Sequence, residues 1–154
     1  MESPPAVDIG NVDSPIGAEL SNFSPHRFVV RGEVCESMEG LLQSLKFADP
    51  TMARSVRALA GRKAKFKGKK SRWWRTQTLF WNGEPFNRHD SDFQALLDEA
   101  FDAMFTQCDA ARWALRATGS AELTHSVGRA DPTLTVLTVE EFISRLQRIR
   151  DELS

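Results

Sequence analysis

The sequence predicts an α+β fold, predominantly helical, in a single domain with a few short strands. Apolar side chains recur at the period of an α-helix in several segments. Short β-branched or alternating runs, typical of strands, stand between some of these segments. The chain has 154 residues, of which 41% are hydrophobic and 27% charged, as expected for one globular domain with its own core.

The N-terminal part is predicted to be irregular at first and then to form a hairpin. The first 17 residues hold three of the seven prolines, and their apolar residues follow neither the helical nor the strand period. We therefore expect an irregular tail over residues 1–15 and one domain over residues 16–154. The run from Phe28 to Val34 has β-prone pieces on both sides of Arg31 and Gly32, which predicts a hairpin.

Two helices are predicted next. Between Glu36 and Phe47, with Ser37 as N-cap, apolar residues fall at i, i+3, i+4 and i+7, namely Met38, Leu41, Leu42 and Leu45. A second short helix is expected from Thr51 to Ala60, with Gly61 just after its end. Residues 62–75 are polar and basic, and we expect a loop or the solvated end of a helix there.

The C-terminal half is predicted to hold the longest helices. The helical period is clearest from Ser91 to Gln107, and another helix is expected from Cys108 to Ala117. Residues 133–138 are β-branched and alternate, which predicts a short strand. A last helix is expected from Val139 to Leu153, with Thr138 as its N-cap.

Composition argues against several classes of protein. Lys and Arg number 20 and Asp and Glu 21, which disfavours a nucleic-acid coat protein. The apolar runs are far shorter than the roughly 18 residues needed to cross a bilayer, and the first residues do not resemble a signal peptide. We expect a cytoplasmic protein with no membrane partner, in which Cys35 and Cys108 are reduced thiols. The three histidines show no zinc-ligand spacing to these cysteines.

The charges are segregated along the chain. No Asp or Glu occurs from Pro50 to Gly83, whereas ten of the 20 basic residues fall between Arg54 and Arg75, which we call the basic segment. This segment is either a solvated basic loop or a surface for a phosphate-bearing ligand, a free nucleotide or a nucleic acid. Three tryptophans lie in or just beyond it, where they could stack on bases or join the core: Trp73, Trp74 and Trp81.

The helix over Glu36–Phe47 has a polar side opposite its apolar stripe. Glu39, Gln43 and Lys46 lie at i, i+4 and i+7 and are therefore stacked on that side. Such a face is commonly solvated. A carboxylate and an amine at this spacing could equally line a cleft and act as an acid or base and a nucleophile, and the spacing alone leaves both open.

The sequence resembles the NADAR (YbiA-like) family over roughly residues 16–150. The resemblance is carried by an LSNF element at Leu20–Phe23 and by the pattern S-x-E-x-x-x-Q-x-x-K-F at Ser37–Phe47. Gly61–Lys65 is similar to the family's glycine-and-basic segment, and Phe105 with Ala114–Gly119 to its Leu-x-x-Thr-Gly pattern. The chain lacks the Trp-Gly-x-Gly element of many members and has no tyrosine, so it resembles a divergent subgroup.

The resemblance implies an N-glycosidase that cleaves the bond between a ribose carbon and a base, without a cofactor. Members act on phosphorylated riboflavin-pathway intermediates or remove ADP-ribose from modified guanine. Cleavage develops positive charge on the sugar, and Glu39 would either stabilise that charge or move protons. Lys46 would pair with Glu39, bind phosphate or attack the sugar carbon. The implied substrate-binding residues are Asn22, Phe23, Gln43, Lys63, Lys65, Trp81 and Asp131.

Two other functions remain open on these residues. One is a non-catalytic module that holds ADP-ribose or a nucleotide, which the missing C-terminal element favours. The other is a basic nucleic-acid-binding domain. The expected partner is a phosphorylated nucleotide or ADP-ribose-bearing molecule, either free or as part of a nucleic acid.

Overall fold

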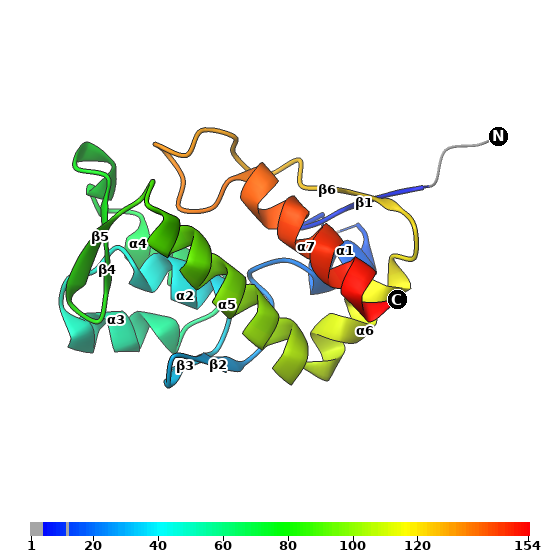
Figure 1. Cartoon of the computed structure of the whole chain (residues 1–154), viewed down its shortest axis with the longest axis horizontal. Coiled ribbons are helices and arrows are strands. Elements are labelled where there is room, and N and C mark those ends of the chain that lie inside the picture. The colour runs from blue at the N-terminus through cyan, green and yellow to red at the C-terminus, as the bar shows by residue number, and fades with distance from the viewer. Residues whose placement is uncertain (1–4, 12) are drawn as a thin grey trace.

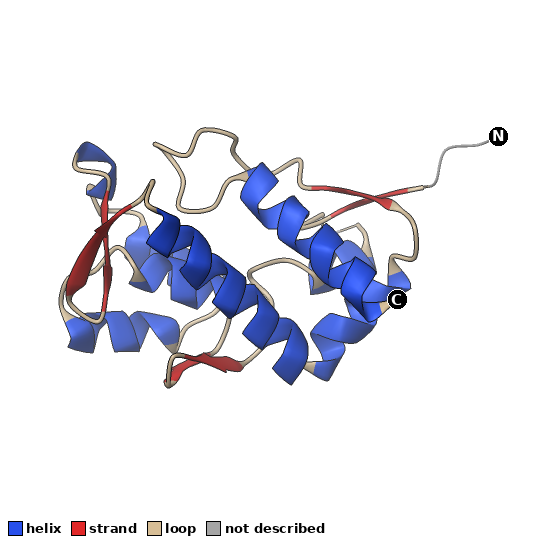
Figure 2. Ribbon diagram, viewed as in Figure 1, coloured by secondary structure: helices blue, strands red, loops and turns tan. Residues whose placement is uncertain are grey.

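The computed structural model describes residues 5–11 and 13–154 of the chain. Within this part it has seven α-helices and three two-stranded sheets, which confirms the predicted α+β class (Figure 2). The helices are α1 (Pro15–Glu19), α2 (Met38–Ser44), α3 (Pro50–Arg57), α4 (Gly61–Gly68), α5 (Ser91–Gln107), α6 (Asp109–Ala117) and α7 (Val139–Leu153), with a 3₁₀-helix η1 at Trp73–Arg75. The strands are β1 (Ala6–Asp8), β2 (Phe28–Val30), β3 (Glu33–Cys35), β4 (Thr78–Trp81), β5 (Glu84–Asn87) and β6 (Glu122–Thr124).

Helix α5 runs through the middle of the molecule. Figure 1 shows α2, α3, α4 and the β4–β5 hairpin on one side of it and α1, α6 and α7 on the other. Its apolar stripe is buried, with Phe93, Leu97 and Phe101 fully covered, and the Phe101 ring lies 5.7 Å from that of Phe142 on α7. Each such side chain contributes roughly 1.5–3 kcal/mol through burial, so α5 joins the two halves of the core. Its predicted range is confirmed.

The predicted hairpin and the start of the helix after it are also confirmed. β2 and β3 pair antiparallel, and Arg31 and Gly32 both have positive φ (50° and 79°), as the tight turns that match strand twist require. The Ser37 hydroxyl then accepts a hydrogen bond from the Gly40 amide at 2.9 Å and begins α2. A side chain at Gly40 would meet the Leu59 carbonyl at 2.5 Å, so this glycine allows α2 to lie against the chain that leaves α3.

The segment after α3 is more helical than expected. α3 ends at Arg57, before Ala60, and Gly61 begins α4 instead of terminating α3. The expectation of a loop or solvated end over residues 62–75 is therefore wrong for residues 62–68. The contact face of α4 consists of small residues, Ala64 and Gly68, which are buried against α2 and give almost no apolar period in the sequence.

The prediction of an irregular tail over residues 1–15 is wrong for residues 6–8. Ala6–Asp8 forms β1, which pairs parallel with β6, and Ile9 just after it is fully buried. Residues 1–4 and 12 lie outside the described part of the chain. Because the two strands are more than 100 residues apart in sequence, this pairing has no local signal. It ties the N-terminal segment to the stretch of chain that connects α6 to α7.

The strand predicted over residues 133–138 is wrong, and a hairpin that was not predicted lies elsewhere. The carbonyls of Thr133 and Thr135 accept hydrogen bonds from the side chains of Gln77 and Arg88, so the backbone is satisfied without a partner strand. The unpredicted hairpin is β4–β5, which turns at Asn82 and Gly83 with φ of 47° and 88°. The helix over Val139–Leu153 is confirmed, with a capping box between Thr138 and Glu141.

Both cysteines are free thiols, as predicted. Cys35 is fully buried, and this burial raises the pKa of its thiol to about 12. Among the described residues, no helix has the length and apolar character needed to cross a membrane.

Candidate active site

The polar side of α2 is not a solvated face. Gln43 is only 9% exposed, and its amide Nε2 donates a hydrogen bond of 2.8 Å to Oε1 of Glu39 one turn earlier. Glu39 and Lys46 are partly buried beside it. Other parts of the chain therefore cover part of this face, and its polar groups bond to one another or approach neighbouring elements.

Helix α4 supplies the cover. A side chain at Gly68 would come within 1.7 Å of Gln43 Oε1 and 3.1 Å of Lys46 Cδ, so only a glycine fits between the two helices. The Lys46 ammonium lies 3.5 Å from the Gly68 carbonyl oxygen, at the end of α4 where helix carbonyls are free. The close approach of α4 therefore fixes Gln43, and Gln43 in turn orients the Glu39 carboxyl.

The LSNF element lies against the start of α2. The Asn22 carbonyl accepts a hydrogen bond of 2.9 Å from the Glu39 amide, and Asn22 Oδ1 is buried with no hydrogen-bond partner among the described residues. The Lys65 ammonium of α4 sits 5.9 Å from the centre of the Phe23 ring. Asn22, Phe23 and Lys65, all proposed from the sequence, are thus brought to the Glu39 side of α2.

Two residues of the loop between β6 and α7 (residues 125–138, the β6–α7 loop) were missed by the sequence analysis. The charge of His125 acts on the Glu39 carboxyl, and that of Arg129 on the Lys46 ammonium. Their approach to α2 depends on the pairing of β1 with β6, which no local pattern reveals. We call Glu39, Gln43, Lys46, Lys65 and His125 the Glu39 cluster.

The environment shifts the pKa values of the two central groups in opposite directions. Burial raises the pKa of Glu39. The Gln43 hydrogen bond and the positive charges of Lys46, Lys65 and His125 lower it, but by less. Burial also lowers the pKa of Lys46, opposed by the Glu39 carboxylate and assisted by Lys65 and Arg129. The cluster therefore holds an acid and an amine, both with a proton affinity altered in the direction that acid–base or nucleophilic chemistry uses.

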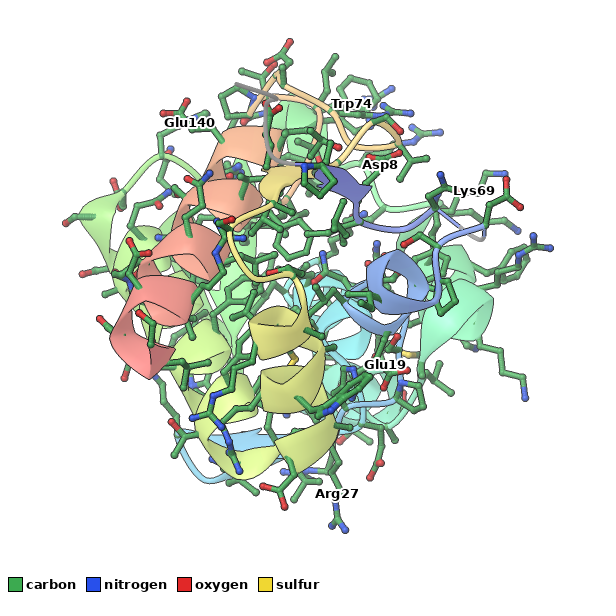
Figure 3. All side chains as sticks on the ribbon, turned by 90° about the vertical axis from the view of Figure 1, so that its right-hand side faces the viewer. Asp8, Glu19, Arg27, Lys69, Trp74 and Glu140 are labelled. Atoms are coloured by element: carbon green, nitrogen blue, oxygen red, sulfur yellow. The ribbon has the colours of Figure 1, made fainter. Side chains whose placement is uncertain are left out.

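The basic segment forms an exposed positive surface over α3, α4 and η1. Nine of its ten cations are exposed, and none of those nine makes an ion pair with a described residue. The tenth, Arg57, is buried and paired with Glu33 at 3.2 Å. Lys69 and Trp74 project at the upper right of Figure 3. On α4, Lys65 faces the Glu39 cluster, whereas Lys63 is two positions away, about 200° around the helix.

Besides Lys63, two predicted residues, Trp81 and Asp131, lie outside the Glu39 cluster. The Cζ atoms of Arg31 and Arg57 lie 5.7 and 5.4 Å from the centre of the Trp81 ring. Together with Arg31 and Phe86, Trp81 also lines a separate hollow of about 340 Å³. Asp131 is exposed, and its carboxylate accepts hydrogen bonds from the Thr133 amide and hydroxyl, which lower its pKa. Of the other tryptophans, Trp73 is buried in the core and Trp74 is 48% exposed.

Known proteins match the chain along almost its whole length. The family model of bacteriophage protein GP30.3 matches residues 15–151. An uncharacterized 17.1 kDa protein from the Gp30-rIII intergenic region of Enterobacteria phage T4 is 34% identical over 136 residues, which cover 87% of this chain and 90% of that protein.

A similar fold is known from a solved structure. The NMR structure of the E. coli protein YbiA has a TM-score of 0.64 to this one, covering 99% of this chain and 87% of that chain at 19% sequence identity. This likeness confirms the YbiA-like fold implied by the motifs at Leu20–Phe23 and Ser37–Phe47. The chain belongs to the bacteriophage GP30.3 protein family and has a YbiA-like fold.

Proposed function

We propose that the protein is an N-glycosidase that hydrolyses the bond between a ribose and a base in a phosphorylated, nucleotide-type substrate. The observation that carries this proposal is the Glu39 carboxyl. It is partly buried, oriented by Gln43 at 2.8 Å, and influenced by cations from α2, α4 and the β6–α7 loop. The YbiA-like fold supports the same class of reaction.

The carboxyl suits the charge that this reaction develops. When a ribosyl C–N bond breaks, positive charge spreads over the ring oxygen and C1′ of the sugar. An ionised Glu39 beside the ring stabilises that charge, and it accepts a proton from the attacking water. The raised pKa makes Glu39 a better base than an exposed glutamate, because a base accepts a proton more readily as its pKa rises.

The surrounding cations suit the phosphate of the substrate. The charges of Lys65 and Arg129 both act on Lys46 in the site, and the exposed cations of the basic segment continue from α4. Positive side chains that lack protein partners are free to bind phosphate oxygens. The site therefore favours a substrate whose cleaved sugar carries phosphate, either as a monophosphate or as part of a diphosphate.

Product analysis tests this function. The protein is incubated in ¹⁸O-water with an aminopyrimidine N-riboside 5′-phosphate and, separately, with an oligonucleotide that carries ADP-ribosylated guanine. Mass spectrometry should find a free base and a sugar that has gained ¹⁸O. Binding of either compound without release of a base would instead support the nucleotide-binding module. Equal binding of unmodified nucleic acid with a steep salt dependence would support the nucleic-acid-binding domain.

A further inference from the structure

His125 is held in a single orientation by groups from distant parts of the chain. Its Nδ1 lies 2.8 Å from the Ile9 carbonyl oxygen, and its ring stands edge-on to Phe142 with 5.1 Å between ring centroids. A side chain at Gly128 would come within 2.4 Å of the imidazole Cδ2. The neighbouring backbone is fixed as well, because the Asp8 carboxylate accepts a hydrogen bond from the Ser126 amide at 2.8 Å.

This arrangement determines which nitrogen of the ring can exchange a proton. A carbonyl oxygen only accepts hydrogen bonds, so Nδ1 must carry a hydrogen and donate it to Ile9. Nε2 is then the nitrogen that gains or loses a proton, and no hydrogen bond joins it to any described residue. The ring is partly exposed, so Nε2 remains available to a ligand.

Two carboxylates from different elements are influenced by the charge of the ring. The Asp8 carboxylate on β1 and the Glu39 carboxyl on α2 both interact with the charge of His125. Two other members of the cluster, Gln43 and Lys46, are less suited to donating a proton to a departing base near neutral pH. Lys46 contacts the Gly68 carbonyl at 3.5 Å, and Gln43 does not titrate. Histidine is the side chain whose ordinary titration falls in that range.

We propose that His125 is the general acid of the reaction in "Proposed function", on which this inference rests, and that it protonates the departing base. The bond from C1′ to the base nitrogen breaks, and its electron pair goes to the base, which takes the proton from Nε2 of the imidazolium. Water attacks C1′ and gives its proton to the Glu39 carboxylate. The products are the protonated base and the 1-hydroxy sugar, and the proton on Glu39 returns to His125 through solvent.

The dependence of kcat on the leaving group distinguishes a general acid from a residue with a purely structural role. The probes are an aminopyrimidine N-riboside 5′-phosphate, whose base needs a proton to depart, and p-nitrophenyl riboside 5′-phosphate, whose nitrophenolate does not. His125→Asn keeps an amide that can donate to Ile9 and removes Nε2. We expect this variant to lose about 10²-fold or more in kcat on the N-riboside and only a few-fold on the nitrophenyl compound. Added imidazole should restore part of the lost rate.

Two variants serve as controls. Glu39→Gln should lose rate on both probes, because both leaving groups depart from the same charged sugar. His89→Gln should lose rate on neither, because His89 is exposed and bonded to Gln77. An equal loss on both probes in folded His125→Asn, or no loss on either, overturns the assignment of the general acid. Absence of cleavage by the unaltered protein overturns the proposed function itself.

Discussion

The charged form of the Glu39 carboxyl is stabilised by its neighbours and destabilised by its burial. The carboxyl gains a hydrogen bond from Gln43 and positive charge from its neighbours, yet burial still raises its pKa. Ionisation of Glu39 therefore weakens the folded state, a cost often found where a group is kept for chemistry.

Replacement of Glu39 by glutamine should stabilise the fold increasingly as pH rises. The folded protein binds the Glu39 proton more tightly than the unfolded chain, so the carboxyl favours folding at low pH and loses that contribution as pH rises through its raised pKa. Glu39→Gln does not titrate and can still accept the hydrogen bond from Gln43. Urea unfolding of both proteins from about pH 4 to 7 measures the difference. A gain that shrinks with rising pH would contradict a raised pKa.

Lys46 allows two mechanisms that one variant can separate. Because burial lowers its pKa, Lys46 loses its proton more easily than an exposed lysine does, and its neutral amine could attack C1′ and form an imine. On that route, borohydride added during turnover traps a ribosyl adduct on Lys46, which mass spectrometry detects. On the same route, Lys46→Arg, which keeps the positive charge, abolishes both the adduct and the activity, whereas direct attack by water, as proposed above, leaves activity in this variant. If activity survives this substitution, Lys46 holds phosphate and water attacks C1′ directly.

At the scale of elements, α4 has two different sides. One side carries Ala64 and Gly68 against α2 and directs Lys65 toward the Glu39 cluster, while the other carries exposed charges such as Lys63. Both lysines belong to the basic segment, so removal of either changes the net charge equally. Substitutions of Lys65 and Lys63 therefore form a matched pair, which separates the effect of one specific contact from that of the summed positive charge.

Lys65→Gln should weaken binding of a phosphorylated ligand much more than Lys63→Gln does. A charge-assisted bond contributes about 1.5–3 kcal/mol, or roughly 10–100-fold in Kd, whereas an exposed charge away from the ligand contributes about 1 kcal/mol or less. Titration of ADP-ribose at two salt concentrations measures both the affinity and its salt dependence. Equal effects of the two substitutions would mean that the basic segment acts only through its summed charge.

The elements that the sequence revealed are those with a local pattern. α5 and α7 have long apolar stripes and polar caps, and Arg31–Gly32 is a strong turn signal. α4 was missed because it packs through Ala64 and Gly68, which look like loop residues next to lysines.

The same distinction applies to the site. The spacing of Glu39, Gln43 and Lys46 predicted their common side of one helix correctly, but not that α4 covers it. His125 and Arg129 were missed because their places depend on β1 pairing with β6, from opposite ends of the chain. Long-range pairing of this kind leaves no trace in either segment alone.

At the scale of the whole molecule, the site is assembled from segments spread over almost the full sequence. The N-terminal strand contributes Asp8, which accepts hydrogen bonds from the Thr124 hydroxyl and the Ser126 amide at 3.0 and 2.8 Å. The Ser126 hydroxyl also donates to the Asp8 carboxylate; this bond first, and then the other two, lower the pKa of Asp8, and together they fasten the start of the β6–α7 loop. The loop in turn carries His125 and Arg129 to the α2 side, so an N-terminal residue sets the geometry of a site centred on Glu39.

Asp8→Ala should therefore reduce activity although Asp8 is not part of the Glu39 cluster. Loss of its hydrogen bonds frees the β6–α7 loop, and misplacement of its side chains should lower kcat/KM by about tenfold or more. Asp13→Ala is the matched control, because Asp13 is exposed and its carboxylate makes no bond within the described part of the chain. Unchanged kcat/KM in Asp8→Ala would show that the loop keeps its position without this anchor.

The most direct test of the whole account is the rate of base release by Glu39→Gln in a single turnover. The account predicts that this variant folds, binds the aminopyrimidine N-riboside 5′-phosphate about as tightly as the unaltered protein, and releases the base about 10²-fold more slowly or worse. Rapid-quench chromatography of the free base, with Kd measured in parallel, gives both numbers. A release rate close to that of the unaltered protein would contradict the assignment of Glu39 as the group on which cleavage depends.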